Sequence, residues 1–175
     1  MKKKILVLCI AFIGLLSITN AQKCKYEYEK VDEISGKVSK AIVNTFADDM
    51  VLIFKNTDGV YSIDIKIIVG LGSDFSVLSN FPIHKGDSLV FKLSNNELIT
   101  FYANKDVIPT SGQNSLVSIY LLYDDVYSIS KEELTKLSTG EIIYLRQFIG
   151  KSEFSAKPKS KENIKFQQAI NCLMQ

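Results

Sequence analysis

The chain has 175 residues, of which 46% are hydrophobic and 23% charged, and its formal net charge is +2. Three lysines and no acidic residue lie within residues 1–21, so the rest of the chain holds 18 of the 21 basic residues and all 19 acidic ones. A nearly neutral domain lacks the strongly basic face of nucleic-acid-binding proteins, so the composition excludes nucleic acid as a partner.

Residues 1–21 have the three parts of a secretory signal peptide. Lys2–Lys4 are positively charged, Ile5–Ile18 form an apolar run, and Thr19-Asn20-Ala21 places small side chains before the expected cleavage site. The apolar run is shorter than the roughly 20 residues that a membrane-spanning helix needs. We therefore expect residues 1–21 to be a signal peptide. Residues 22–175 are expected to form a single soluble β-rich domain without a membrane span, exported to the periplasm or the extracellular space.

Two cysteines, Cys24 and Cys172, remain after removal of the expected signal peptide. In an oxidising compartment, two remaining cysteines favour a disulfide, which here would join the two ends of the domain. Two alternatives stay open. Cys24 could carry a lipid anchor, although Lys23 precedes it where such anchors follow small residues. Cys172 could instead remain a free thiol on the apolar face of a C-terminal helix.

Hydrophobic and polar residues alternate along much of the chain, which is the spacing of half-buried β-strands. In the clearest strand one face carries Tyr61, Ile63, Ile65, Ile67 and Val69. The preceding Asn56-Thr57-Asp58-Gly59 predicts a hairpin with Val51–Phe54, because Gly59 can adopt a positive φ without a Cβ clash. Further strands are expected at residues 26–28, 38–46, 89–93, 98–102, 116–123 and 142–149, and residues 104–114 are expected to form a surface loop.

Helical patterns occur late in the chain. Ser130-Lys131-Glu132-Glu133 is a capping box that predicts a short helix over residues 130–139. Ser160 is expected to cap a C-terminal amphipathic helix, whose apolar residues include Phe166 and Leu173. The fold class expected is therefore mainly β, an antiparallel sandwich or a curled sheet with the last helix packed on it. An α+β arrangement is the alternative.

Few residues point to catalysis or metal binding. His84 is the single histidine and lies in a turn-like segment, so we interpret it as a solvent-exposed loop residue. One histidine and two distant cysteines do not supply the ligands of a zinc site. The adjacent acids Asp124-Asp125 lack the pattern of a calcium loop and are interpreted as solvated turn residues. We expect no catalytic residues, no metal and no cofactor.

Tyrosines and the lone arginine are the candidate ligand-binding residues. Tyr120, Tyr123 and Tyr144 lie in the C-terminal strands, where exposed aromatic rings can stack on sugars or peptides. The alternative is that these tyrosines are ordinary strand residues with their hydroxyl groups at the rim. Arg146 could recognise an anion, or it could form a structural ion pair with a carboxylate.

Four segments carry a resemblance to a known group of proteins: Asn20-Ala21-Gln22, Lys25–Asp32, Tyr127–Leu134 and Ile142–Arg146. With these segments the chain resembles small secreted proteins of unknown function from Bacteroidetes-type bacteria. The resemblance implies an exported bacterial protein, and it brings no activity or site residues.

These observations favour a binding or interaction module over an enzyme, with a protein or a carbohydrate as the partner. One alternative is a hydrolase of envelope or extracellular polymers that works through paired carboxylates. Another is an envelope structural or assembly component that uses an open sheet edge for strand addition. Two facing carboxylates in a pocket would favour the hydrolase, and a long unprotected edge strand would favour assembly.

We predict that export removes residues 1–21, so that the secreted protein begins at Gln22. Intact-mass measurement of the exported protein tests this directly. A species that retains Lys2–Lys4, or one that carries a lipid on Cys24, would contradict the prediction.

Overall fold

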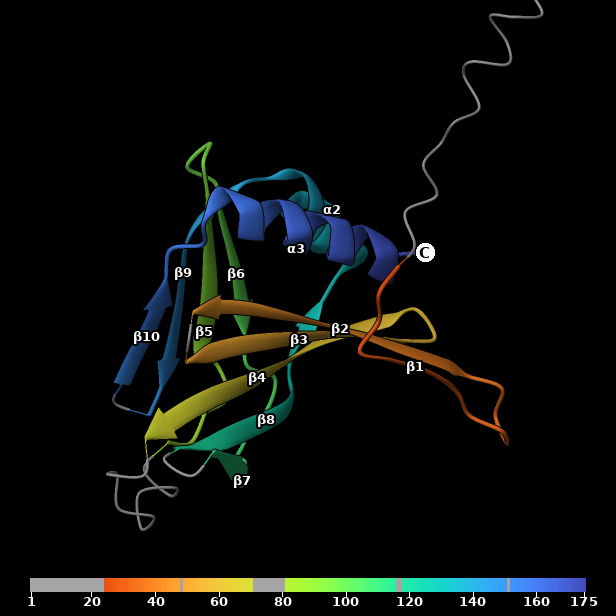
Figure 1. The fold of residues 1–175 in the computed structure, drawn as a ribbon, viewed down its shortest axis with the longest axis horizontal. Helices are drawn as coiled ribbons and strands as arrows, with labels where there is room; N and C mark the ends of the chain where they lie inside the picture. Colours follow the sequence, from red (N-terminus) through yellow and green to blue (C-terminus); the bar gives the residue numbers. More distant parts are fainter. Residues whose placement is uncertain (1–23, 48, 71–80, 116–117, 151) are drawn as a thin grey trace, which may run out of the picture.

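A computed structural model describes residues 24–47, 49–70, 81–115, 118–150 and 152–175, and the expected signal peptide lies outside these ranges. The described chain is mainly β, as predicted (Figure 1). Its elements in chain order are β1 (Tyr28–Val31), β2 (Val38–Ala47), β3 (Met50–Thr57), β4 (Val60–Gly70), β5 (Ser88–Leu93), β6 (Leu98–Tyr102), β7 (Thr110–Ser115), β8 (Ser118–Ile129), α2 (Lys131–Thr139), β9 (Ile142–Ile149), β10 (Ser152–Ala156) and α3 (Ser160–Leu173). None of the described helices is long and apolar enough to cross a membrane.

The described strands form two antiparallel sheets. One has six strands in the order β1-β2-β3-β4-β8-β7, and the other has four in the order β10-β9-β5-β6. The six-stranded sheet curls, and the four-stranded sheet crosses its inner face while α3 lies over one end (Figure 1). An isolated bridge between Ala103 and Tyr127 connects the two sheets beside β6 and β8. The structure thus has the curled antiparallel sheet and the C-terminal helix that the sequence predicts.

The hairpin of β3 and β4 turns as predicted. Thr57 pairs with Val60, and the two residues between them have positive φ, 53° at Asp58 and 84° at Gly59. Two successive positive φ values define the type I′ turn, whose twist matches that of the flanking strands. The Asn56 side chain also accepts a hydrogen bond from the Gly59 N–H (2.9 Å).

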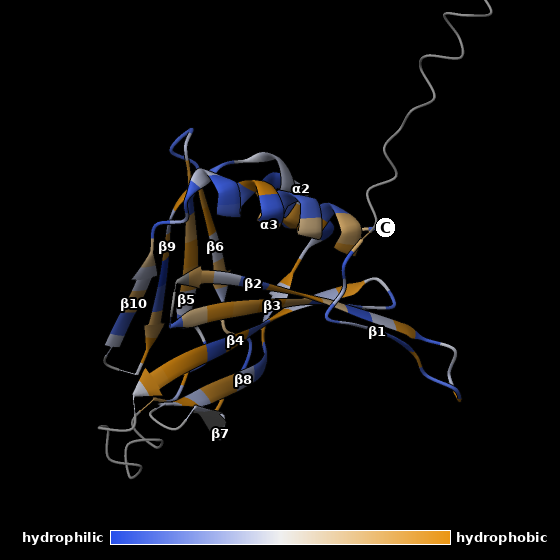
Figure 2. Cartoon of the chain, in the orientation of Figure 1, coloured by the Kyte–Doolittle hydropathy of each residue, from blue (hydrophilic) through white to orange (hydrophobic). Residues whose placement is uncertain are grey.

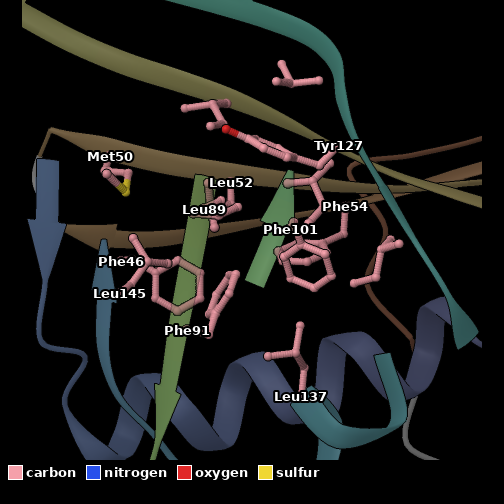
Figure 3. Close-up of a cluster of buried hydrophobic side chains, with 14 of the residues drawn as sticks. Phe46, Met50, Leu52, Phe54, Leu89, Phe91, Phe101, Tyr127, Leu137 and Leu145 are labelled. Atoms are coloured by element: carbon pink, nitrogen blue, oxygen red, sulfur yellow. The ribbon is translucent and has the colours of Figure 1, made fainter. Parts of the chain in front are cut away.

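The alternating side chains of β4 face the core, which confirms the expected buried face. Tyr61, Ile63, Ile65 and Ile67 are at most 9% exposed, and Val69 is half-buried against the same core. Figure 3 shows Phe46 and Phe54 of the six-stranded sheet meeting Phe91 and Phe101 of the four-stranded sheet. Residues with apolar side chains therefore fill the space between the two sheets.

Both predicted helices are present. In α2 the capping box is complete, because Ser130 accepts from the Glu133 N–H (3.2 Å) while the Glu133 carboxylate accepts from the Ser130 N–H (2.8 Å). In α3 the capping residue is Lys159, one position before the predicted Ser160, and its N–H donates to the Glu162 carboxylate (2.7 Å). Figure 2 shows that α3 presents mainly hydrophilic residues to the outside.

The prediction that residues 104–114 form a surface loop is wrong for the second half of this segment. β7 begins at Thr110 and pairs with β8 as an edge strand of the six-stranded sheet. The residues of β7 are polar and do not alternate with apolar ones. Backbone hydrogen bonds to β8, and not apolar side chains of its own, hold this strand in the sheet. The short strand β10 pairs with β9 and was likewise not predicted.

The two ends of the described chain meet at the C-terminus of α3. The Cα atoms of Cys24 and Cys172 lie 5.5 Å apart, so the cysteines are at disulfide distance. The Tyr26 hydroxyl donates to the Cys172 carbonyl (2.9 Å), and the Asn56 side chain donates to the Leu173 carbonyl (2.9 Å). These side chains satisfy carbonyls that the last turn of a helix leaves without a helical partner.

We predict that titration of the unfolded, unreduced protein finds no free thiol, because Cys24 and Cys172 form a disulfide. Replacing both by serine should lower the free energy of unfolding by about 2–5 kcal/mol, since the bond closes nearly the whole described chain. Urea denaturation of both forms measures this loss. Two free thiols in the unreduced wild-type protein would refute the bond.

Candidate functional site

The outer face of the six-stranded sheet carries a pocket of about 450 Å³. We call it the outer-face pocket. Its central side chains come from four neighbouring strands: Val43 and Thr45 of β2, Val51, Ile53 and Lys55 of β3, Asp64 and Lys66 of β4, and Leu122 and Asp124 of β8. Glu27 and Tyr28 form its border at the start of β1. The pocket therefore lies across the sheet, on the face opposite to the core.

Strand register arranges these side chains in rows. Val43 pairs with Ile53, which in turn pairs with Asp64. In the next row Val51 pairs with Lys66, which pairs with Leu122. Because successive side chains on a strand point to opposite faces, residues between these positions belong to the core. The same alternation that fills the core thus gives the outer face a mixture of apolar and charged side chains.

Lys55 and Asp64 form the central ion pair of this face. Lys55 Nζ lies 2.6 Å from Asp64 Oδ2, and the Asp64 side chain is only 2% exposed. Asp125 and Asp124 lie farther from the same nitrogen, at 3.4 and 3.8 Å. One lysine therefore neutralises part of the charge of three aspartates, and the buried Asp64 receives its closest contact.

A bulge in β8 brings these aspartates to Lys55. Ile63 pairs with Tyr127 and Ile65 pairs with Tyr123, so three residues of β8 lie opposite Asp64 alone. Within the bulge Asp125 has a φ of 49°, a conformation that aspartate tolerates better than most residues. Its N–H donates to Asp64 Oδ1 (2.7 Å), so the Asp64 carboxylate stabilises the bulge. Asp124-Asp125 are thus part of an interrupted strand and not of a turn.

Burial and charge move the pKa values of this cluster in different directions. Burial raises the pKa of Asp64, and its hydrogen bonds with Lys55 and the Asp125 N–H only partly oppose that rise. For Lys55, burial acts to lower the pKa, but the hydrogen bond and the charge of Asp64 raise it above its ordinary value. For Asp125, burial acts to raise the pKa, but the Lys55 charge and the Ser62 hydroxyl bring it below its ordinary value.

Three carboxylates line the pocket, those of Glu27, Asp64 and Asp124, yet the buried one is not arranged as a free acid or nucleophile. Both oxygens of Asp64 are engaged, Oδ1 by the Asp125 N–H and Oδ2 by Lys55. Asp124 lies at the rim with its side chain 54% exposed. Within the described residues there is no group of three or more His, Cys, Asp or Glu side chains that could hold a metal ion. The geometry therefore suits contact with a ligand better than proton transfer.

The predicted tyrosines of β8 lie on opposite faces of the sheet. Tyr120 is half-buried on the outer face, where Lys66 Nζ lies 4.5 Å from the ring centroid. Tyr123 is fully buried, and its hydroxyl donates to the Phe81 carbonyl (2.7 Å). Burial also raises the pKa of Tyr123 above its usual range. Tyr123 is therefore a core residue and Tyr120 a surface residue beside the outer-face pocket.

Tyr144 and Arg146 lie on β9, in the other sheet, so the four candidate residues do not form one site. The Tyr144 hydroxyl donates to Glu153 (3.4 Å) on the neighbouring strand. The Arg146 guanidinium lies 5.3 Å from the Phe148 ring centroid, and its Nε is buried without a hydrogen-bond partner. Within the described residues Arg146 makes no ion pair, so the structural ion pair considered from the sequence does not form there.

His84 is exposed, as expected, but it has an acidic neighbour that the sequence did not indicate. Its Nδ1 lies 3.7 Å from Asp106, and both side chains are more than half exposed. Two backbone N–H groups in this loop donate to carboxylates, His84 N–H to Asp87 and Lys85 N–H to Asp106. Asp87 and Asp106 therefore stabilise the backbone conformation of this loop.

Sequence reasoning missed Lys55 and Asp64 as partners, although a signal was present. A two-residue hairpin loop at Asp58-Gly59 requires Lys55 to pair with Ser62 and Ile53 to pair with Asp64. Lys55 and Asp64 are then diagonal neighbours on one face, within reach of a long side chain. The predicted hairpin therefore implied the ion pair, whereas the bulge that adds Asp125 had no signal.

Comparisons with known proteins find no matching family model, no matching curated protein and no matching solved structure. The resemblance to secreted proteins of Bacteroidetes-type bacteria stays a prediction.

We predict that Lys55→Met lowers the free energy of unfolding by about 3 kcal/mol at pH 7, because it leaves the buried Asp64 carboxylate without its cation. In this variant Lys55 no longer opposes the effect of burial on Asp64. The Asp64 pKa is therefore higher in the folded state than in the unfolded state, and folding takes up a proton. The stability loss should then shrink as the pH falls from 7 toward the ordinary pKa of aspartate, about 3.9, because Asp64 takes up a proton over that range. Urea denaturation across this pH range measures it.

Lys66→Met is the matched control, since it removes a cation from the same face without leaving a buried carboxylate. This variant should lower the free energy of unfolding by less than about 1 kcal/mol, with little dependence on pH. Equal losses in the two variants, or a Lys55→Met loss that is the same across this pH range, would contradict the role of the ion pair.

Proposed function

We propose that this protein is an exported binding module and that the outer-face pocket is its contact surface. The observation that supports this proposal is a set of apolar side chains on the sheet face opposite to the core, which lie between charged side chains held in fixed positions. Val43 is 40% exposed, and Ile53 on β3 and Leu122 on β8 are half-buried on the same face. Apolar contact surface beside a few oriented polar groups is typical of ligand and protein binding sites.

The Lys55–Asp64 pair supports binding because it gives the pocket a rigid polar centre. An ion pair that is largely buried and hydrogen-bonded on both sides keeps its geometry, so a ligand meets a preformed surface. Lys66 and Asp124 lie at other positions around the pocket and offer opposite charges to a partner. A protein segment or a carbohydrate carries the apolar and polar groups that such a surface can contact.

Export is part of this proposal. It is supported by the three-part leader in residues 1–21 and by the cysteine pair at disulfide distance, since disulfides persist in oxidising compartments. A hydrolase is the alternative, because Asp64 and Asp124 both line the pocket. The engagement of both Asp64 oxygens argues for binding instead.

We predict that Ile53→Thr weakens binding at this surface. The test titrates the ¹⁵N-labelled protein with a panel of short peptides and a panel of oligosaccharides, and follows backbone amide shifts. Binders should shift amides of β2, β3 and β4, and their affinity for Ile53→Thr should fall about fivefold or more, because apolar contact area is lost.

Ile143→Thr is the matched control, because Ile143 is 39% exposed on the other sheet. The affinity of this variant for the same ligands should equal that of the wild type. Binders that shift amides only on other surfaces, or that bind Ile53→Thr as well as wild type, would overturn the proposal. Cleavage of an oligosaccharide in the panel would establish the hydrolase instead.

A further inference from the structure

β2 has an open edge beside the outer-face pocket. β1 pairs with residues Val38–Ala41 of β2 and no farther. From Ile42 to Ala47, β2 pairs with β3 on one side, and no other described strand pairs with it on the opposite side. The sheet therefore ends at this half of β2, while its other half continues into the projecting β1–β2 hairpin (Figure 1).

Two hydrogen bonds fix which backbone groups face this edge. The Val38 carbonyl accepts from the Asp58 N–H, on the side of β3, whereas the Ala41 carbonyl accepts from the Glu27 N–H, on the side of β1. Backbone groups alternate in direction along an antiparallel strand. The N–H and C=O groups of Val43 and Thr45 therefore point away from β3, toward the open edge. A change of register between Thr45 and Ala47 ends this regular stretch.

A second hollow of about 340 Å³ lies on the other side of this edge, between β2, α3 and the segment that follows Cys24. We call it the basic hollow, since its charged residues are Lys25 and Lys165 and no carboxylate lines it. Asn44 and Gln168 also line it, and Asn44 Nδ2 is buried without a hydrogen-bond partner. The hollow thus offers two cations to an acidic group.

Val43 lines both hollows, so the open edge runs between them. A strand that pairs with this edge would place successive side chains alternately into the two hollows, because successive side chains on a strand point to opposite faces. This is the arrangement of strand addition, in which backbone hydrogen bonds give affinity and alternate pockets give sequence preference.

We propose that the edge of β2 at Val43 and Thr45 pairs with an extended segment of a partner protein. An acidic side chain of that segment enters the basic hollow, and the apolar side chains before and after it contact the outer-face pocket. The inference rests on the proposed function, since it names the partner class and the binding mode for that surface.

Charge distinguishes this occupant from two others. A second copy of the chain would pair through its own residues Ile42–Phe46, which contain no carboxylate for the basic hollow. The N-terminal residues of this chain carry Lys2–Lys4 and no acid, so they would bring like charge to Lys25 and Lys165. An extended segment of another protein with an acidic residue between apolar ones is complementary to both hollows, the acidic residue to the basic hollow and the apolar ones to the outer-face pocket.

The test selects peptides from a random seven-residue peptide library displayed on phage, using the purified protein with its cysteine pair oxidised. Selected peptides are expected to carry Glu or Asp between two apolar residues. Fluorescence anisotropy then measures the affinity of the selected peptide for wild type and variants. Hydrogen exchange should show that the amides of Val43 and Thr45 become protected when the peptide binds.

Val43→Pro removes the edge N–H but no hydrogen bond to β3, and edge strands tolerate proline at such positions. It should weaken binding at least about tenfold more than Val43→Ala does, because Val43→Ala loses only apolar contact and keeps the N–H. Lys165→Glu should weaken binding of the acidic peptide about fivefold or more, and Lys161→Glu, on the same helix but outside the hollow, should not. Thermal melts confirm that each variant is folded.

Several results would overturn the inference: no peptide is selected, selected peptides lack an acidic residue, or Val43→Pro binds as wild type. Dimers in light scattering that Val43→Pro abolishes would assign the edge to a second copy instead. If Val43→Pro leaves binding intact while Ile53→Thr weakens it, strand addition fails and the proposed outer-face surface stands. If neither variant changes the affinity, both proposals fail.

Discussion

The packing of phenylalanine rings between the two sheets and α3 is the contact on which the rest of this structure depends. Phe46 of β2 lies against Phe91 of β5 and Phe166 of α3, with ring centroids 6.0 and 5.1 Å apart. Phe54 of β3 also meets Phe166, at 5.3 Å. Aromatic side chains bury large apolar areas, so this cluster commits one face of the curled sheet to the core (Figure 3). The opposite face is thereby left for contacts outside the molecule.

Polar groups inside the molecule are paired, and two such pairs hold elements together. Tyr127 of β8 donates to Gln147 of β9 (2.9 Å), which links the two sheets through their buried faces. Asn163 of α3 both accepts from and donates to the backbone of Ile142, at 3.0 and 2.9 Å. Because an unpaired buried polar group is costly, such pairs fix the relative positions of the elements that carry them. The unpaired Asn44 Nδ2 and Arg146 Nε are exceptions within the described chain.

The open edge of β2 follows from how the N-terminal segment is held. Tyr28 pairs with Ala41, and the residues that precede Tyr28 turn toward the end of α3. There the Tyr26 hydroxyl donates to the Cys172 carbonyl, and Cys24 lies at disulfide distance from Cys172. A chain directed toward α3 cannot also continue along β2. The same path encloses the basic hollow, so one set of contacts near Cys172 produces both features of the inferred docking edge.

Local chemistry in the sequence determined the β3–β4 hairpin, the α2 capping box and the buried face of β4, because each depends on residues close together in the chain. It also indicated the pairing of Cys24 with Cys172, since these are the two cysteines outside the expected signal peptide. The tertiary structure decided which contacts form between distant segments. Tyr120 and Tyr123 are three residues apart on one strand, so alternation puts them on opposite faces, and packing against the second sheet decides which of the two is buried. The polar strand β7 exists because β8 offers it backbone hydrogen bonds, and the bulge at Asp125 exists because Asp64 accepts its N–H. Such features depend on partners far away in sequence, which alternation within one strand does not identify.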